Sequence, residues 1–193
     1  MGVRLMRDIS LHLLDILQNS ISAKATEITV HIGAIPSQDL LYLKVTDNGV
    51  GMEKELLRRV VDPFVTTRKT RPIGLGLPLL KEAAKRSGGD LVITSSKGRG
   101  TKVKATFGLT HIDRPPLGNI ADTVVVVVTA HPDLELEVSF SNQTASQKLK
   151  LAEIRKHLGN VPLNEAEVLN WIKDYLKQSQ KAIFGGVLDE VNC

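Results

Sequence analysis

The sequence predicts an α/β fold in which a first helix precedes strands that alternate with further helices. Apolar residues recur at helical spacing from Ile9 to Leu17, whereas residues 27–32 and 41–46 alternate or run apolar as strands do. A chain of 193 residues is long enough for one well-buried core and a smaller appendage. We therefore expect one principal domain with a C-terminal extension.

The first half of the chain contains the remaining elements of this principal domain. Asp8 is expected to cap the first helix, and a loop containing Pro36 joins the first two strands. A short helix, a longer helix closed by Gly88-Gly89 and a pair of strands come next. The expected ranges are residues 53–60 and 78–87 for these helices and residues 91–95 and 102–107 for these strands.

The sequence changes character beyond Phe107, where Arg114-Pro115-Pro116 forms a rigid connection. Residues 120–129 are apolar enough to be buried, but their secondary structure is ambiguous. Their valines favour a strand, whereas Asn119 as a cap favours a helix. Both alternatives remain open at this point.

A β-hairpin and two helices are predicted for the rest of the chain. Residues 134–141 and 148–151 alternate on either side of a polar turn, which is typical of a hairpin. The first helix ends at Gly159, and the second begins at Asn164 with Glu167 in a capping-box-like position. We expect residues 1–109 and 110–193 to form the principal domain and the extension.

The extension has two interpretations. Its hairpin could add strands to the sheet, and its last helix could bury Val168 and Ile172 against the core. Alternatively, it could form a docking surface or a dimer interface, with Trp171 and Tyr175 as anchors. Both interpretations require an apolar face, so the sequence pattern does not separate them.

Composition narrows the classes of protein to which the chain can belong. The net charge of +4 is spread without a dense basic tract, and aromatic residues make up 4%, so nucleic-acid binding is not indicated. The single cysteine, Cys193, excludes an intrachain disulfide and indicates a cytoplasmic protein. The most apolar run, Val124 to Val128, is too short to cross a membrane.

A first motif points to recognition of adenine. Asp47 ends a predicted strand, where its carboxylate can accept a hydrogen bond from the exocyclic amine of adenine. The following residues, Gly49, Gly51 and Met52, let the backbone turn tightly beside a flat base. An ordinary Asp-Asn-Gly turn would also account for this segment taken alone.

Two further motifs supply phosphate and metal binding. Gly74-Leu75-Gly76-Leu77 places flexible backbone directly before a helix, whose N-terminal amides attract phosphate. Asp15 and Asn19 lie one turn apart on one helix face. The Asn19 amide oxygen suits Mg²⁺, and the Asp15 carboxylate can orient or deprotonate the attacking group. We therefore predict ATP and Mg²⁺ as ligands, Asp15 as the catalytic residue and Asn19 as the metal ligand.

In this order the motifs resemble those of the GHKL ATPases, the superfamily of gyrase, the heat-shock chaperone ATPase, histidine kinases and MutL. Asp15 to Asn19 resembles the N box, Asp47 to Met52 the first glycine box, residues 62–67 the F box and Gly74 to Leu77 the second glycine box. The match covers about residues 8–108. The full pattern most resembles the catalytic ATP-binding domain of sensor histidine kinases.

The resemblance implies a two-layer α/β sandwich, with helices on one face of a mixed, mostly antiparallel sheet and ATP between these helices and a mobile lid. It makes Asn19 the magnesium ligand, Asp47 the adenine contact and Gly51 part of the adenine pocket. The other implied residues are Phe64 at the lid base, Gly74 and Gly76 at the phosphates, Thr101 near the base, and Thr67, Arg68, Lys69 and Arg71 in the lid. Positive charge in the lid could contact the terminal phosphate, although a solvated basic loop is an equal alternative.

The chain also departs from sensor histidine kinases. The segment from Asn19 to Ala25 resembles the MutL version of the N box instead. A sensor kinase carries its phosphorylated histidine on a long helical hairpin before the N box, and we expect this dimerisation and phosphoacceptor domain to be lacking here. His12 shares a helix with Asp15, so we interpret it as a packed or surface histidine.

Two classes of function follow. The first is Mg-dependent ATP hydrolysis or phosphoryl transfer in regulation, with a phosphoacceptor on a separate protein. The second is a non-catalytic, nucleotide-gated protein-binding switch that resembles the anti-sigma factors of the superfamily. We expect a protein partner or a phosphoacceptor in trans, and a homodimer is a further expectation. Neither involves a membrane or a nucleic acid.

Overall fold

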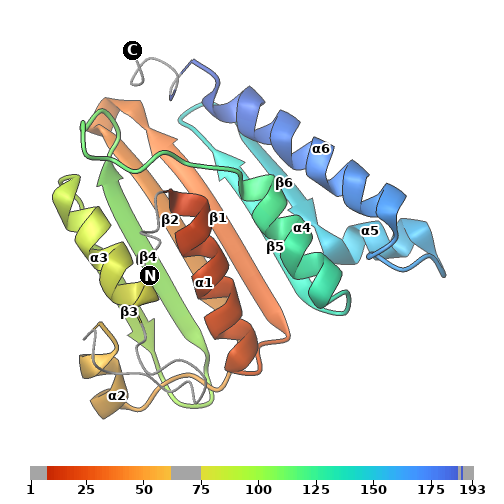
Figure 1. Ribbon diagram of the computed structural model, residues 1–193, viewed down its shortest axis with the longest axis horizontal. Helices are drawn as coiled ribbons and strands as arrows, with labels where there is room; N and C mark the ends of the chain where they lie inside the picture. Colours follow the sequence, from red (N-terminus) through yellow and green to blue (C-terminus); the bar gives the residue numbers. More distant parts are fainter. Residues whose placement is uncertain (1–7, 62–74, 187, 189–193) are drawn as a thin grey trace, which may run out of the picture.

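The computed structural model describes residues 8–61, 75–186 and 188, and a six-stranded sheet runs through them (Figure 1). The strands lie in the order β3-β4-β2-β1-β5-β6. Neighbouring strands are antiparallel except β1 and β5, which run parallel. The strands are β1 Glu27–Ile35, β2 Leu40–Asp47, β3 Leu91–Ser95, β4 Thr101–Gly108, β5 Glu135–Ser141 and β6 Ser146–Lys150.

Helices form the second layer on one face of this sheet, with α3, α1, α4 and α6 side by side across it (Figure 1). The result is a mixed, mostly antiparallel α/β sandwich, as predicted. No helix in the described ranges is long and apolar enough to span a membrane. The helices are α1 Ile9–Ser22, α2 Lys54–Arg59, α3 Gly76–Arg86, α4 Ile120–Ala130, α5 Leu151–Leu158 and α6 Ala166–Phe184, with a 3₁₀ turn η1 at Pro36–Gln38.

Alternation along the strands separates the core from an uncovered face. On β2, Leu41, Leu43 and Val45 are buried, whereas Lys44 and Thr46, which alternate with them, are partly exposed. Successive side chains of a strand point to opposite faces, so the buried set meets the helices. The other set remains on the face that no described helix covers, an arrangement common in antiparallel sheets.

The run of five valines lies in α4, which decides between the two alternatives that the sequence left open. The Oδ1 atom of Asn119 accepts a hydrogen bond from the Asp122 amide at 3.1 Å and caps the helix. Ile120, Val124 and Val128 are fully buried at helical spacing. Packing of this apolar face therefore outweighs the intrinsic preference of valine for strands.

The C-terminal hairpin extends the sheet, because β5 pairs with β1 and β6 pairs with β5. Val168 and Ile172 of α6 join the same hydrophobic core as α1 and β1. Trp171 of α6 is not part of this core and is 54% exposed. The division of the chain into domains at residues 109 and 110 stays a prediction.

Several predicted boundaries were wrong, including the end of the first strand, which runs three residues further to Ile35. Helix α3 begins at Gly76, two residues early, because proline is tolerated in a first helical turn and Pro78 does not delay the helix. Leu151 begins α5 and does not end β6. The capping box at Asn164 is absent: the Glu165 amide bonds to the Pro162 carbonyl at 3.2 Å, so a turn carries the chain past Asn164 before α6 begins.

Candidate functional site

Helix α1 presents the predicted catalytic and metal-binding residues on consecutive turns. Its start is fixed by Asp8, whose Oδ1 accepts a hydrogen bond from the Leu11 amide at 2.9 Å. Asp15 and Asn19 lie one turn apart, and Asn19 Nδ2 donates to Asp15 Oδ2 at 3.0 Å. Because Nδ2 makes this bond, the amide oxygen of Asn19 is the atom suited to a cation.

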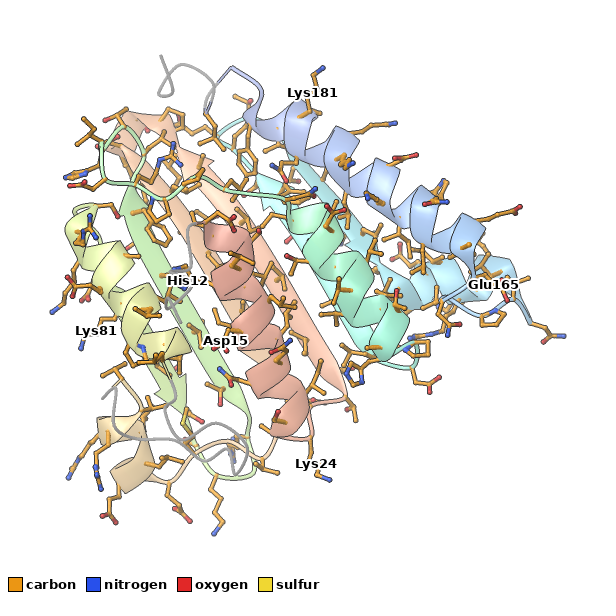
Figure 2. The ribbon with its side chains drawn as sticks, in the orientation of Figure 1. His12, Asp15, Lys24, Lys81, Glu165 and Lys181 are labelled. Atoms are coloured by element: carbon orange, nitrogen blue, oxygen red, sulfur yellow. The ribbon has the colours of Figure 1, made fainter. Side chains whose placement is uncertain are left out.

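Helix α3 brings the second glycine motif against Asp15. A Cβ atom on Gly76 would lie 1.7 Å from Asp15 Oδ2, so this close approach requires glycine. Figure 2 shows Asp15 on the side of α1 that faces α3. Leu75 is the N-cap residue and Leu77 packs against the core. Gly76 and Leu77 thus lie inside the first helical turn and not in a loop before it, because the helix starts early.

Asp47 ends β2 with its carboxylate held by three donors. Oδ1 accepts hydrogen bonds from the Gly49 amide at 2.9 Å and the Thr101 amide at 3.2 Å. Oδ2 accepts from Ser20 Oγ at 2.9 Å. The side chain is 8% exposed and its acceptor atoms are fixed where α1 meets the sheet. A carboxylate offers about four acceptor positions, so these bonds leave room for one ligand donor.

The loop after Asp47 packs against the turn between β3 and β4. Gly51 has a φ of +64°, and a Cβ atom there would lie 2.0 Å from the Ser96 carbonyl oxygen. The Met52 amide donates to Ser95 Oγ at 2.8 Å. The backbone of this glycine motif is therefore set by close contact and does not depend on a ligand.

Sequence reasoning assigned no role to three residues that hold the site together. Ser20 binds Asp47, and Ser95 binds both Met52 and the Thr101 hydroxyl, the latter at 2.9 Å. The third is Asn48, whose Oδ1 accepts from the Thr26 and Glu27 amides, both at 2.9 Å. A signal existed for Ser95 alone, because strand pairing places it opposite Thr101.

His12 is buried in α1, with an exposed fraction of 1%. Neither ring nitrogen has a hydrogen-bond partner among the residues that the structure describes. Burial lowers the pKa of His12, against the opposing influence of Asp15 and Asp8. The imidazole is therefore neutral near pH 7, and His12 is a packed histidine, one of the two environments expected for it.

The structure gathers most of the predicted site residues at one end of the helix and sheet layers. Within the described ranges, no three His, Cys, Asp or Glu side chains form a metal cage. Mg²⁺ usually takes one or two protein ligands together with phosphate oxygens and water, so Asn19 fits such a site without a cage. The predicted lid and phosphate residues Phe64, Thr67, Arg68, Lys69, Arg71 and Gly74 lie outside the described residues.

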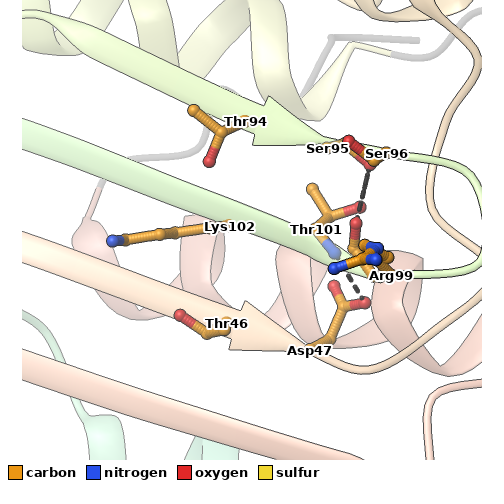
Figure 3. Close-up of a pocket in the computed structure, with 9 residues that line it drawn as sticks. Thr46, Asp47, Thr94, Ser95, Ser96, Arg99, Thr101 and Lys102 are labelled. Atoms are coloured by element: carbon orange, nitrogen blue, oxygen red, sulfur yellow. Dashed lines mark hydrogen bonds between the residues drawn. The ribbon is translucent and has the colours of Figure 1, made fainter.

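A hollow of about 210 Å³ lies on the opposite side of the sheet (Figure 3). Thr46, Thr94 and Lys102 line it, and all three belong to the set of strand residues that faces away from the helices. Asp15 and Asn19 are not part of its lining. Asp47, Ser95 and Thr101 also line the hollow, which therefore adjoins the predicted nucleotide site at the end of β2.

Comparison with protein families gives a match to the histidine kinase-, DNA gyrase B- and HSP90-like ATPases over residues 7–111. Similar proteins are a putative sensor protein of Shewanella frigidimarina, 32% identical over 107 residues, and the sensor histidine kinase WalK of Bacillus subtilis, 33% identical over 100 residues. These alignments cover 52% and 48% of this chain and 16% of each relative. The chain thus spans about one sixth of the length of these relatives.

A solved structure of similar fold is the crystal structure of the N-terminal domain of a DNA repair protein. It superposes with a TM-score of 0.50 at 12% identity and covers 76% of this chain and 52% of that chain. At this identity the likeness concerns the fold alone, and it agrees with the α/β sandwich.

Proposed function

The chain belongs to the family of histidine kinase-, DNA gyrase B- and HSP90-like ATPases, and we propose that it binds Mg-ATP and transfers the γ-phosphate to water or to a separate protein. The observation that carries this proposal is the Asp15–Asn19 pair on α1, held directly against Gly76 at the start of α3. A carboxylate, a metal-binding amide and a helix N-terminus thus lie together, as phosphoryl transfer requires.

The adenine end of the site is Asp47. Its carboxylate is fixed by Ser20, Gly49 and Thr101 and retains capacity for one more donor. In the proposed complex the exocyclic amine of adenine fills that position. The tight backbone at Gly51 then lies beside the base, as the first glycine box of the family implies.

The phosphate end is the N-terminus of α3. Leu75, its N-cap residue, has no polar side chain to satisfy the first amides, so these amides can serve an anion. Asn19 would hold the magnesium ion, whose charge offsets that of the phosphates. The absence of a side chain at Gly76 keeps the helix end close to Asp15.

Asp15 acts as the general base in the catalytic version of this proposal. Its hydrogen bond from Asn19 orients the carboxylate. The carboxylate takes the proton from the attacking hydroxyl or water as the new bond to phosphorus forms. Because the similar relatives include sensor kinases, we propose a phosphoacceptor on a separate protein and a role in signal transduction in the cytoplasm.

The alternative is a nucleotide-gated binding switch without catalysis. One observation favours it: beyond the family match, α6 exposes Trp171, which stacks on Tyr175 with ring centroids 5.4 Å apart. Exposed aromatic pairs are frequent anchors of protein interfaces, including homodimers. In this version ATP binding alone would control the partner.

An Asp15→Asn variant separates the two functions. Asparagine matches aspartate in size but cannot act as a base, so we expect ATP affinity to change by less than about threefold and phosphate release or transfer to fall about 100-fold. Calorimetry measures binding, and γ-labelled ATP measures turnover alone and with a cell lysate. The matched control is Asp174→Asn, an exposed helical aspartate on α6, which should change neither quantity.

Equal turnover by wild type and Asp15→Asn would show that Asp15 is not the general base. Binding without phosphate release or protein labelling by wild type would instead favour the switch. Loss of ATP binding in the Asp174→Asn control would indicate a defect in folding and not in the site.

A further inference from the structure

The uncovered face of the sheet has two halves, which differ in how many of their lysines have a carboxylate partner. On the half made by β5 and β6, Lys150 Nζ lies 3.3 Å from Glu137 Oε2 and Arg155 pairs with Glu135, whereas Lys148 has no carboxylate within 4.0 Å in the part of the chain that the structure describes. On the half made by β2 and β4, Lys44, Lys102 and Lys104 have no carboxylate within 4.0 Å among the described residues. Within the described ranges, three lysines without a carboxylate partner therefore lie together on the half made by β2 and β4, against one on the half made by β5 and β6.

The pairing of β2 with β4 places two of these lysines where their charges repel each other. Lys44 of β2 lies directly opposite Lys104 of β4, and the Cβ atoms of residues paired in this way are about 5 Å apart. Lys102 lies on the same face two residues along β4, about 6.6 Å from Lys104. Like charges placed directly opposite each other destabilise a sheet. An anionic partner bound beside these lysines would reduce their repulsion.

The positive charge of these lysines also affects His31 on β1, the strand next to β2. Burial lowers the pKa of His31 on β1, and the positive charge of Lys44 lowers the pKa further, while Glu137 opposes the change. His31 is also held by Ser141, whose Oγ lies 2.8 Å from Nε2. The effect on His31 agrees with an excess of positive charge around Lys44.

The hollow of about 210 Å³ continues this charged surface at the ends of β2, β3 and β4 (Figure 3). Arg99 and Lys102 contribute cations to its lining, and Thr46, Thr94 and Ser96 contribute hydroxyl groups that can donate hydrogen bonds. Convergent cations and hydroxyls are the groups that bind an oxyanion. Asp47 and Thr101, which belong to the proposed adenine end of the nucleotide site, complete the polar lining.

We propose that the basic face formed by Lys44, Arg99, Lys102 and Lys104 binds an acidic segment of a separate protein, with one carboxylate of that segment in the hollow. We choose a protein as the partner over single-stranded nucleic acid because, among the described residues, this face offers no exposed aromatic ring on which bases could stack. The aromatic ring on this face, Tyr42, is instead packed over Gly33 and bonded to His31. The basic face shares Asp47 and Thr101 with the nucleotide site only at the hollow. Lys44, Lys102 and Lys104 lie on the opposite side of the sheet from the Asp15–Asn19 pair, so the inference does not depend on ATP binding.

The test uses a fluorescein-labelled peptide of eight glutamates and the full chain at low salt. We expect a Lys44→Gln, Lys102→Gln, Lys104→Gln variant to bind the peptide at least about tenfold more weakly than wild type. Its melting temperature should be equal or higher, because the like-charge pair is removed. A matched control, Lys85→Gln, Lys156→Gln, Lys177→Gln, removes three exposed lysines of α3, α5 and α6 and should change affinity by less than about threefold.

Equal peptide affinity in the two triple variants would overturn the proposal, because net charge alone would then explain the binding. A stronger interaction with an oligothymidylate of eight nucleotides, also lost in the first variant, would overturn it in favour of nucleic acid. The Asn19→Ala variant, which removes the proposed magnesium ligand and does not line the hollow, should bind the peptide like wild type. A failure of the ATP site therefore remains distinguishable from a failure of the basic face.

Discussion

Replacement of Asp47 by asparagine is expected to lower the affinity for ATP about 100-fold while the fold is retained. Asparagine keeps one oxygen for the Gly49 and Thr101 amides and gains an amino group that can donate to Ser20 Oγ. The same amino group of asparagine would also face the exocyclic amine of adenine. Both groups are donors, so no hydrogen bond forms between them. The loss of a charge-assisted hydrogen bond of about 2.7 kcal/mol corresponds to this factor.

Calorimetry of ATP binding, together with a thermal melt, measures both parts of this prediction. Asp90→Asn is the matched control: Asp90 is exposed, and its Oδ1 accepts from the Leu91 amide at 2.8 Å away from the site. Alanine at position 47 is a poorer test, because it would leave buried donors without an acceptor. Unchanged ATP affinity in Asp47→Asn, with normal melting, would remove Asp47 from base recognition.

The second large effect is expected for Gly51→Ala, which should lower the free energy of unfolding by about 3 kcal/mol or more. Alanine is strained at a φ of +64°, and its Cβ would lie 2.0 Å from the Ser96 carbonyl oxygen. The loop must then move away from the turn between β3 and β4. For a chain of this size, the melting temperature should fall by about 6–12 °C.

Gly98→Ala isolates the contribution of backbone strain. Gly98 has a φ of +74°, but a Cβ atom there meets nothing within 4 Å. We expect it to lose only about 1 kcal/mol. If both alanine variants melt at the same temperature, the close contact at Ser96 does not constrain the glycine motif.

Much of the fold could be predicted from local patterns. The cap at Asp8 and the strand alternation depend on neighbours in the sequence, and both predictions are confirmed. The valine run in α4 could not be assigned, because its preference is decided by packing against α1 and α6. Asn164 misled the prediction of α6, since a capping residue also suits the turn that precedes the helix.

The site was predicted from motif order, which specifies residues but not the contacts between them. That Ser20 would hold Asp47 depends on how α1 packs against the end of β2, 27 positions away in the chain. The contact between Gly76 and Asp15 likewise joins two helices that the sequence separates. The basic face was not foreseen, because Lys44 and Lys104 become neighbours only through the register of β2 and β4.

The central claim is that the end of β2, together with α1 and α3, forms a site for adenine nucleotides. Titration of the unmodified chain with Mg-ATP and Mg-GTP tests this claim most directly. The Asp47 carboxylate accepts a hydrogen bond from the adenine amine but faces an acceptor oxygen at the same position of guanine. We predict that ATP binds and that GTP binds at least about 100-fold more weakly. Equal affinity for the two nucleotides, or no binding of ATP, would contradict the account.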